Sequence, residues 1–335
     1  MAFDLLNIQP HKVSRDLSGY ITFIYGPPKT GKTTLATQMP QPLLLAFEKG
    51  YNAIPGIIAQ DVTTWGEMKQ IYRELKKPEV QAAYKSIIID TIDIAADLCQ
   101  KYICNQLGID NMGDGGWGTN SWPKYKKEFE EIFRGLTMMG YAVVFISHAT
   151  TNPIKDASGK EVGTEIKPST QSSALKIIEN MADIYGYAHA VAQEDGSTKM
   201  RLTLRSPANS GIACGCRFKY IQPEIDFNYD SLAATLTEAI DKEASEHGNK
   251  FVTDERENVP IVKEYDFDAL MKQFETMVGE LMAKDQEFYA PRITQIIERY
   301  LGKGNKMSGV TRDQAELVYL VVTEITDDLY ANMNK

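Results

Sequence analysis

Cysteine is scarce in this sequence, with only four residues (Cys99, Cys104, Cys214 and Cys216) among 335. Four thiols are too few to cross-link a chain of this length, so a disulfide scaffold is excluded. Cys214 and Cys216 flank one glycine, but no second pair of ligands follows at zinc-finger spacing. A structural zinc site is therefore not expected.

Long apolar runs are also missing. No stretch reaches the roughly 18 uninterrupted apolar residues that a membrane-spanning helix needs. The first residues, MAFDLLNIQPHKVSRD, scatter charges where a secretory signal would place an apolar segment. These two features argue against membrane insertion and secretion, and we expect a cytoplasmic protein with no membrane partner.

Basic charge is not in excess. The chain holds 36 Lys and Arg against 45 Asp and Glu, a net charge of −9. Residues 243–335 account for −7 of this, so residues 1–242 are nearly neutral at −2. This balance excludes a histone-like protein that coats nucleic acid through net charge, but it leaves room for local basic patches.

Short β-rich apolar runs alternate with longer amphipathic stretches in the first half of the chain. The runs predict buried strands, and the stretches predict helices that connect them. This alternation is typical of an α/β fold with a parallel sheet covered by helices on both faces. The expected strands are residues 20–25, 42–47, 86–90 and 141–147, and the expected helices are residues 33–38, 64–75, 92–107 and 123–139.

The second half shows a different pattern. Shorter strands are expected at 184–193, 198–205 and 217–221, joined as antiparallel hairpins at the sheet edge. After a helix ending near Ala244, the polar stretch SEHGNKFVTDERENVPIVKEYD predicts a linker. Apolar residues then recur at helical spacing, with a cap expected at Thr311, and predict a small helical bundle. The expected organisation is an α/β core over 1–242, an acidic linker over 243–265 and a helical domain over 266–335.

The clearest motif is GPPKTGKT, which matches G-x-x-x-x-G-K-[ST] between an expected strand and an expected helix. In such a loop, backbone N–H groups surround phosphate oxygens, the lysine binds the β- and γ-phosphates, and the hydroxyl ligates Mg²⁺. Two prolines of the loop lack an N–H, so the donors are expected from Lys29 to Thr34. The motif predicts a Mg-ATP site made by Gly26, Pro27, Pro28, Lys29, Thr30, Gly31, Lys32, Thr33 and Thr34.

Two carboxylates are expected near this loop. Asp90 ends a buried strand, the place where P-loop enzymes hold magnesium, although a strand-terminal aspartate can also cap the next helix. The following residue is Thr91, whereas AAA-plus ATPases usually have their catalytic glutamate there. RecA-like ATPases instead carry it at the end of the neighbouring strand, where this chain has Glu48. Glu48 is therefore expected to orient the attacking water, with a solvated surface carboxylate as the alternative.

The strand AVVFIS ends in Ser147 and His148, beside the expected γ-phosphate. We expect His148 either to sense that phosphate or to be a structural side chain.

At these motifs the chain resembles the AAA-domain phage nucleotide-binding proteins, a RecA-like family that includes single-strand annealing proteins of the Sak type. The resemblance runs through GPPKTGKTT, LLLAFEKGYNAIPG, SIIIDTID, GDGGWGTNSW, VVFISH, EIKPST and NMADIYGY, over about residues 15–240. It implies an oligomeric RecA-like ATPase, in the cytoplasm of a phage-infected or prophage-carrying bacterium, that acts on single-stranded DNA during recombination.

RecA-like proteins grip DNA with two loops, and the resemblance implies counterparts here. The loop 111–122 carries Trp117 and Trp122, which either stack on bases or anchor the loop to the core. The loop 150–167 offers Lys155, Lys160 and Lys167 to the DNA backbone. Acidic neighbours dilute both loops, so the expected DNA affinity is modest and strongly salt-dependent.

The resemblance also implies a basic residue that reaches a neighbouring subunit's ATP site. Arg217 is the first candidate and Arg205 the second, within the most basic window of the chain. Gly215 stands where hexameric helicases often have lysine, and an ordinary solvated arginine is the alternative. The acidic C-terminal helices are expected either to bind a protein partner or to support assembly.

Three functions follow as hypotheses. The first is a DNA- and oligomer-stimulated ATPase. The second is a nucleotide-gated DNA-binding or annealing module in which hydrolysis is incidental. The third is a P-loop kinase for a small molecule, for which no arginine-rich lid is evident.

Overall fold

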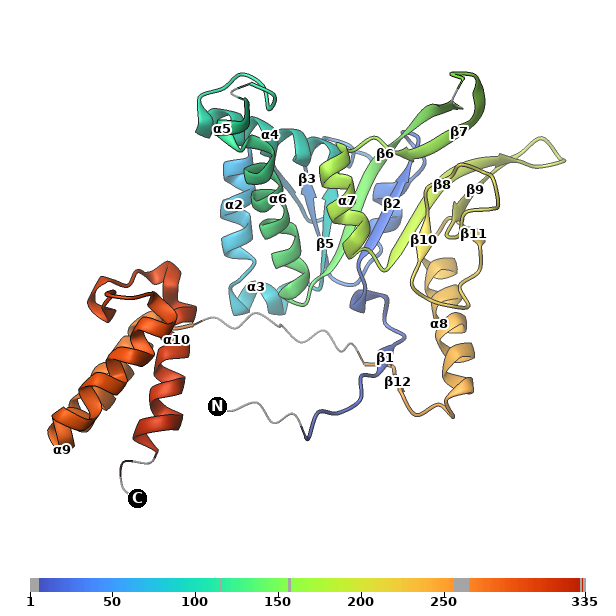
Figure 1. Cartoon of the computed structure of the whole chain (residues 1–335). Helices are drawn as coiled ribbons and strands as arrows, with labels where there is room; N and C mark the ends of the chain where they lie inside the picture. The colour runs from blue at the N-terminus through green and yellow to red at the C-terminus, as the bar shows by residue number, and fades with distance from the viewer. Residues whose placement is uncertain (1–5, 115, 156–157, 256–264, 332, 334–335) are drawn as a thin grey trace. The chain divides into compact units, whose positions relative to one another are not determined.

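The computed structural model describes residues 6–114, 116–155, 158–255, 265–331 and 333, with side chains from 118 onward in the helix that starts at Gly116. The chain divides into two compact units, Gln9–Val262 and Lys263–Lys335, the second together with Met1–Ile8. The first unit is the expected α/β part of the chain, and we call it the core below. The second is helical (Figure 1).

A mixed sheet runs through the core in the order β11-β9-β8-β2-β6-β5-β3-β4. The strands β2, β3, β4, β5, β6 and β8 pair in parallel, while β9, β10 and β11 add antiparallel pairs at the β8 side. The bounds are β2 Thr22–Gly26, β3 Pro42–Ala46, β4 Ala59–Asp61, β5 Ser86–Asp90, β6 Ala142–Lys155, β7 Glu161–Pro168, β8 Ile184–Ala192, β9 Thr198–Thr203, β10 Gly215–Cys216 and β11 Glu224–Asp226.

Helices cover both faces of this sheet (Figure 1). Successive side chains of a strand point to opposite faces, so Ile87 and Ile89 face one side and Ile88 faces the other. One core cluster packs under α2, α4, α6 and α7, and the other under α1 and α8. The bounds are α1 Lys32–Ala36, α2 Trp65–Glu74, α3 Pro78–Ala83, α4 Ile92–Leu107, α5 Gly116–Thr119, α6 Ser121–Met138, α7 Ser172–Met181 and α8 Tyr229–Glu246.

The four expected parallel strands and their connecting helices are present, with shifts of a few residues at their ends, except that β6 continues to Lys155. The antiparallel pair β8 and β9 is also present, with Gly196 in the connecting turn at a φ of +81°. The prediction of a strand at 217–221 is wrong. The Arg217 N–H still donates to the Asp183 carbonyl, beside the last β10–β8 pair, but the Ile221 N–H donates to the Phe218 carbonyl, which makes a turn. Two short antiparallel strands flank this turn, β10 before it and β11 after Pro223.

The expected linker contains regular structure in its described part. Helix α8 continues to Glu246, and β12, Val252–Thr253, pairs in parallel with β1, Val13–Ser14. Arg15 fastens this pair to the core through ion pairs of 2.6 Å to Asp241 and 2.7 Å to Asp254. Residues as far as 255 therefore pack with the core, because β1 supplies backbone partners that a local pattern does not reveal. Residues 256–264 lie outside the described part of the chain.

The expected loop at 150–167 is a β-hairpin instead. Strand β6 continues past His148 and pairs with β7 from Ala149↔Pro168 to Lys155↔Glu161. We call these two strand segments the arm, and Figure 1 shows it extending beyond the helices of the core. The expected loop at 111–122 contains the short helix α5 and the first turn of α6.

The helical unit consists of α9 Phe267–Leu301 and α10 Ala315–Glu324, which continues as the π-helical turn η4 Ile325–Tyr330. Asp285 breaks α9 with a φ of −159°, so the two separate helices expected in this stretch are both present. Thr311 forms the expected cap, together with Gln314, on a short 3₁₀ turn before α10. Apolar side chains of α9, α10 and η4 form a separate cluster around Leu281 and Val318. No helix among the described residues has the length and apolarity to cross a membrane.

We predict that Gly26→Ala destabilises the core. A Cβ at this position would lie 2.3 Å from the Ala188 carbonyl oxygen, so β2 and β8 would have to separate. Overpacking of this kind costs about 1–3 kcal/mol. The change is measured by urea denaturation with tryptophan fluorescence, which reports the core alone because all three tryptophans precede residue 123.

Gly215→Ala is the matched control for this prediction. Gly215 also lies in a strand paired with β8, but a Cβ there would meet no atom within 4 Å. We expect a change in unfolding free energy below about 0.5 kcal/mol. Equal effects of the two substitutions would contradict the close approach of β2 and β8.

Candidate nucleotide site

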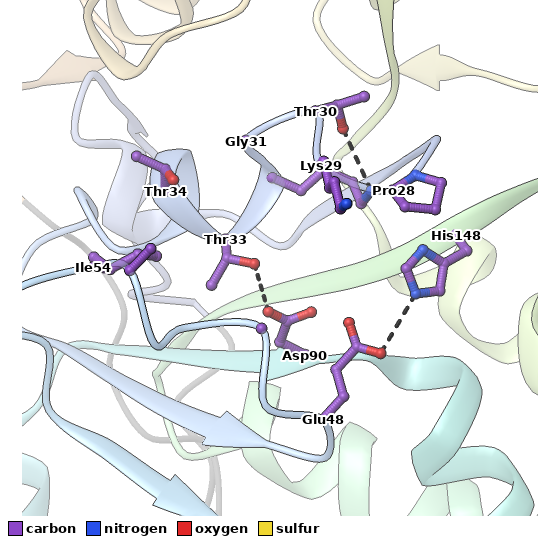
Figure 2. Close-up of a pocket in the computed structure, with 13 residues that line it drawn as sticks. Pro28, Lys29, Thr30, Gly31, Thr33, Thr34, Glu48, Ile54, Asp90 and His148 are labelled. Atoms are coloured by element: carbon purple, nitrogen blue, oxygen red, sulfur yellow. Dashed lines mark hydrogen bonds and ion pairs between the residues drawn. The ribbon is translucent and has the colours of Figure 1, made fainter.

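A cavity of about 360 Å³ lies where β2, β3, β5 and β6 bring their functional side chains together (Figure 2). Parallel α/β sheets bind ligands at the carboxyl ends of their strands, and this cavity is at that edge. Its lining includes most of the residues predicted from the sequence. They are Pro28, Lys29, Thr30, Gly31, Lys32, Thr33, Thr34, Glu48, Asp90 and His148, joined by Gly50, Ala53 and Ile54.

The loop between β2 and α1 has the shape of a phosphate-binding loop. Gly31 takes a φ of 87° directly before the first turn of α1, a conformation that favours glycine. Lys32 is only 6% exposed. Its Nζ donates to the carbonyl oxygens of Gly26 at 2.9 Å and Pro27 at 2.7 Å. The ammonium group of Lys32 thus hydrogen-bonds to carbonyl groups of its own loop. A phosphate bound in this loop would compete with these carbonyls for the ammonium group.

Thr33 and Asp90 meet at the cavity floor, where Thr33 Oγ1 donates to Asp90 Oδ2 at 2.6 Å. A Cβ added to Gly50 would lie 3.7 Å from Glu48 Oε1, 3.9 Å from Asp90 Oδ2 and 4.0 Å from Thr33 Oγ1. Because glycine has no side chain, a space remains here that is bounded by the oxygen atoms of these three side chains. Hard oxygen donors of this kind suit Mg²⁺, so the residues present fit the expected metal.

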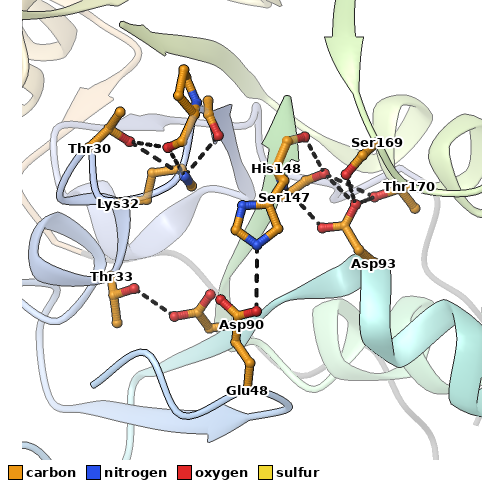
Figure 3. A network of polar contacts seen from close by, with 12 residues as sticks. Thr30, Lys32, Thr33, Glu48, Asp90, Asp93, Ser147, His148, Ser169 and Thr170 are labelled. Atoms are coloured by element: carbon orange, nitrogen blue, oxygen red, sulfur yellow. Dashed lines mark hydrogen bonds and ion pairs between the residues drawn. The ribbon is translucent and has the colours of Figure 1, made fainter. Parts of the chain in front are cut away.

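Backbone hydrogen bonds bring Glu48 to this site. The Asp90 carbonyl accepts the N–H groups of Phe47 at 2.7 Å and Glu48 at 3.3 Å, which turns the chain after β3 toward the end of β5. Glu48 is about one-third exposed, and its Oε2 lies 3.5 Å from His148 Nε2 (Figure 3). His148 Nδ1 is buried and has no hydrogen-bond partner within the described chain.

Burial shifts the two most enclosed charges in opposite directions. It lowers the pKa of Lys32, and the carboxylates of Asp90 and Glu48 oppose this change. It raises the pKa of Asp90, and the hydrogen bond from Thr33 opposes that change. Both shifts have the same cause, which is that the charged form loses water. A cation near Asp90 and an anion near Lys32 would favour the charged form of each group.

One residue of the site was not predicted from the sequence. Asp93 accepts hydrogen bonds from Ser147 Oγ, Ser169 Oγ and Thr170 Oγ1, and from the His148 N–H (Figure 3). It lies three residues after Asp90, within the motif SIIIDTID. An acidic residue in the first turn of a helix is common for electrostatic reasons alone, so the motif gave no sign of these partners.

The two arginine candidates lie away from the cavity of their own chain. Arg217 contacts Asp183 at 3.3 Å and the Asn180 carbonyl at 2.9 Å, and 60% of its side chain is exposed. Asp183 accepts the N–H of Ile21, just before β2 begins. The cavity lies at the other end of β2. At about 3.3 Å per residue, the two ends of this strand are about 13 Å apart. Arg205 donates to the carbonyls of Phe218 and Lys219, so it braces a turn.

The expected DNA-binding residues are spread over the arm and the start of α6. Trp122 is 38% exposed. Its ring packs edge-to-face with the Tyr125 ring, with 6.0 Å between the ring centroids. Lys155 and Lys160 are exposed, whereas Lys167 pairs with Glu165 at 2.6 Å. The side chain of Trp117 lies outside the described part of the structure.

The chain is similar to known proteins in three comparisons. A family model described as an AAA domain matches residues 18–212. An uncharacterized SPbeta prophage-derived protein of Bacillus subtilis (strain 168) is 28% identical over 331 residues, which cover 98% of this chain and 99% of the relative. Among solved structures, a KaiC-like protein from Pyrococcus horikoshii OT3 is 14% identical, with a TM-score of 0.32 over 57% of this chain and 81% of that chain. The family match covers more than half of the sequence and includes every residue of the cavity, and this chain therefore belongs to the AAA domain family.

Proposed function

We propose that the protein binds Mg-ATP in this cavity and hydrolyses it to ADP and phosphate. The observation that supports this most is the meeting of four separate chain segments at one cavity. The phosphate loop, Glu48, Asp90 and His148 come from β2, β3, β5 and β6, and all four line the same space. A chance glycine-rich turn would not bring a carboxylate pair and a histidine with it.

The proposed roles follow from position and charge. The N–H groups of residues 29–34 and Lys32 Nζ bind the β- and γ-phosphates, where Lys32 also offsets negative charge on the transferred group. Thr33 and Asp90 would hold Mg²⁺, which supplies charge neutralisation between the β- and γ-phosphates when bound.

In the hydrolytic step, Glu48 acts as the general base. Its carboxylate accepts a proton from water as the water oxygen bonds to the γ-phosphorus, and the bond to the β–γ bridging oxygen breaks. ADP leaves with the electron pair of that bond. His148, 3.5 Å from Glu48, holds the carboxylate and meets the γ-phosphate side of the cavity.

We further propose that the protein uses this ATPase activity to act on single-stranded DNA in phage recombination or replication. The support is a prophage-derived relative that matches nearly the whole chain, and an arm that begins one residue after His148. Trp122 would stack on bases, and Lys155, Lys160 and Lys167 would contact phosphates. Trp117 is proposed with them on the resemblance alone.

Assembly is a part of the same proposal. Arg217 is too far from its own cavity to act there, and its side chain is more than half exposed. In a ring or filament it would serve the ATP site of the next subunit, after leaving Asp183. The C-terminal helical unit would bind a protein partner or support this assembly.

We predict that Lys32→Ala lowers kcat/KM for ATP by at least about 100-fold, because it removes the cation that stabilises the transferred phosphate. Phosphate release with purified protein measures the change. Lys85→Ala is the control, since Lys85 is exposed and precedes β5 at the opposite edge of the sheet. ATP turnover that persists in the Lys32 variant would place the activity outside this cavity.

We predict that Glu48→Gln lowers kcat by about 100-fold or more while the Kd for Mg-ATP stays within about threefold, because loss of a general base affects the chemical step. Pre-steady-state phosphate release and fluorescent-nucleotide titration separate the two quantities. Glu194→Gln, in the exposed β8–β9 turn, is the control. A kcat equal to that of the wild type would remove Glu48 from the mechanism.

We predict that single-stranded DNA binds in the presence of Mg-ATP and that its affinity falls about 20-fold between 50 and 200 mM salt, as three phosphate contacts require. Fluorescence anisotropy measures both. Lys155→Ala should make the salt dependence shallower by about 0.7 in log–log slope, whereas Lys85→Ala should not change it. If the strand neither binds nor stimulates turnover, the DNA proposal fails and the ATPase proposal stands.

A further inference from the structure

The arm joins the core through two short segments, which we call its roots. One root precedes Ala149 and the other follows Pro168. Strand β6 is part of the central sheet up to the pair Gly26↔His148, and the next residue, Ala149, pairs with Pro168 of β7. The outgoing root is Ser147 and His148, and the returning root is Ser169 and Thr170. The Ser169 N–H donates to the His148 carbonyl at 2.9 Å, so the roots touch.

Asp93 holds both roots from the side. Its Oδ1 accepts from Ser147 Oγ at 2.9 Å, Ser169 Oγ at 2.6 Å and Thr170 Oγ1 at 2.9 Å. Its Oδ2 accepts the His148 N–H at 3.2 Å. The partners lie 54 to 77 residues away in the sequence. Figure 3 shows the carboxylate between the two segments, with the hydroxyl groups directed at it.

The chemistry of this cluster favours a carboxylate. Three hydroxyl groups and one backbone N–H converge on Asp93, and an ionised carboxylate offers two acceptor oxygens and no donor. Hydrogen bonds to a charged acceptor are also stronger than neutral ones. An asparagine has the same shape, but its NH₂ group would face either the His148 N–H or the hydroxyl cluster. The site therefore distinguishes Asp from Asn.

Asp93 also lies close to the proposed chemistry. The residue whose N–H it holds, His148, lines the cavity and contacts Glu48 through its ring. Asp93 itself does not line the cavity among the described residues. A small movement of His148 toward or away from a γ-phosphate would reach both roots of the arm through this carboxylate.

Beyond its roots, the arm is braced by hydrogen bonds at Ile166. Tyr25 Oη donates to the Ile166 carbonyl at 3.0 Å, and the Ile166 N–H donates to Gly211. Tyr25 precedes Gly26 of the phosphate loop, so this brace also starts beside the cavity. The tip of the arm beyond Ile166 has its pairs within the hairpin.

We propose that Asp93 is a positioning residue that couples the γ-phosphate end of the cavity to the arm. It keeps His148 beside Glu48 and makes both roots of the arm move with His148. The inference rests on the proposed ATPase function and adds a residue that does not touch the nucleotide. Its consequence is that the position of the arm depends on the bound nucleotide.

The test uses the full-length chain with Asp93→Asn, and with Asp97→Asn as the matched control one turn later on the same helix. Steady-state kinetics give kcat and KM for ATP. Hydrogen exchange of arm peptides 149–155 and 161–168, without ligand and with Mg²⁺ and a non-hydrolysable ATP analogue, gives the response of the arm. Fluorescent-nucleotide titration gives the Kd independently of turnover.

We expect Asp93→Asn to lower kcat about tenfold or more while KM and the nucleotide Kd stay within about threefold. The analogue should slow hydrogen exchange in the wild-type arm and should not slow it in the variant. Asp97→Asn should match the wild type in all three measurements. A merely structural role for Asp93 would raise exchange throughout the core and leave the nucleotide response of the arm in place.

Thr170→Val keeps the test decisive if Asp93→Asn does not fold. It removes one hydroxyl from the cluster, keeps the side-chain shape and lies away from the cavity lining. It should weaken the arm response in the same direction. Where Asp93→Asn folds, the effects of the two substitutions should not add in the double variant.

The outcomes separate the two proposals. If the wild type binds and turns over ATP while its arm does not respond to the analogue, or while both variants respond as the wild type does, the coupling is wrong and the ATPase proposal stands. If the wild type binds no nucleotide, the ATPase proposal fails and the coupling fails with it.

Discussion

The cavity depends on the hydrogen bonds of one residue, Asp90. Its carbonyl accepts the N–H groups of Phe47 and Glu48, and its carboxylate accepts the Thr33 hydroxyl. One position at the end of β5 therefore holds the chain after β3 and the first turn of α1. This is possible because β5 lies between β3 and β6 in a parallel sheet, so that the ends of these strands meet at the same edge.

The two buried charged groups of the cavity have hydrogen-bond partners within the chain, but burial disfavours their charged forms. Lys32 is buried and donates to carbonyls of its own loop, while Asp90 is buried and accepts from one hydroxyl. Burial opposes the charged form of both. Enclosed charges with few partners are weak contributors to stability, and they are typical of sites that exchange these partners for a ligand.

The basic residues of the antiparallel strands show how sequence and structure diverge. The window from Lys199 to Lys219 is the most basic in the sequence, but the fold neutralises much of it. Lys199 pairs with Asp226, Arg201 with Glu224 and Asp226, and Lys219 with Glu246. Much of the positive charge of this window is thus paired with carboxylates of the same chain. The proposed DNA contacts lie on the arm and α6 instead.

Local patterns were sufficient for the phosphate loop, the parallel strands and the C-terminal helices. The motif residues are contiguous, and the strands and helices repeat with their own periods, so neighbouring residues carry the information. Glu48 required one step more, because its place beside Asp90 depends on β3 and β5 being neighbours in the sheet. The order of strands could be anticipated only through the resemblance to RecA-like proteins.

The sequence alone predicted the phosphate loop and the carboxylate that we propose for magnesium, and it placed them at the ends of buried parallel strands. The tertiary structure was needed to reveal the arm, the turn at residues 217–221, the β1–β12 pair and the four partners of Asp93. Each of these depends on hydrogen bonds between segments far apart in the chain, such as Asp93 with Ser169, 76 residues later. Such pairings are selected by the fold as a whole, because a backbone or hydroxyl group accepts any partner that the packing brings within reach.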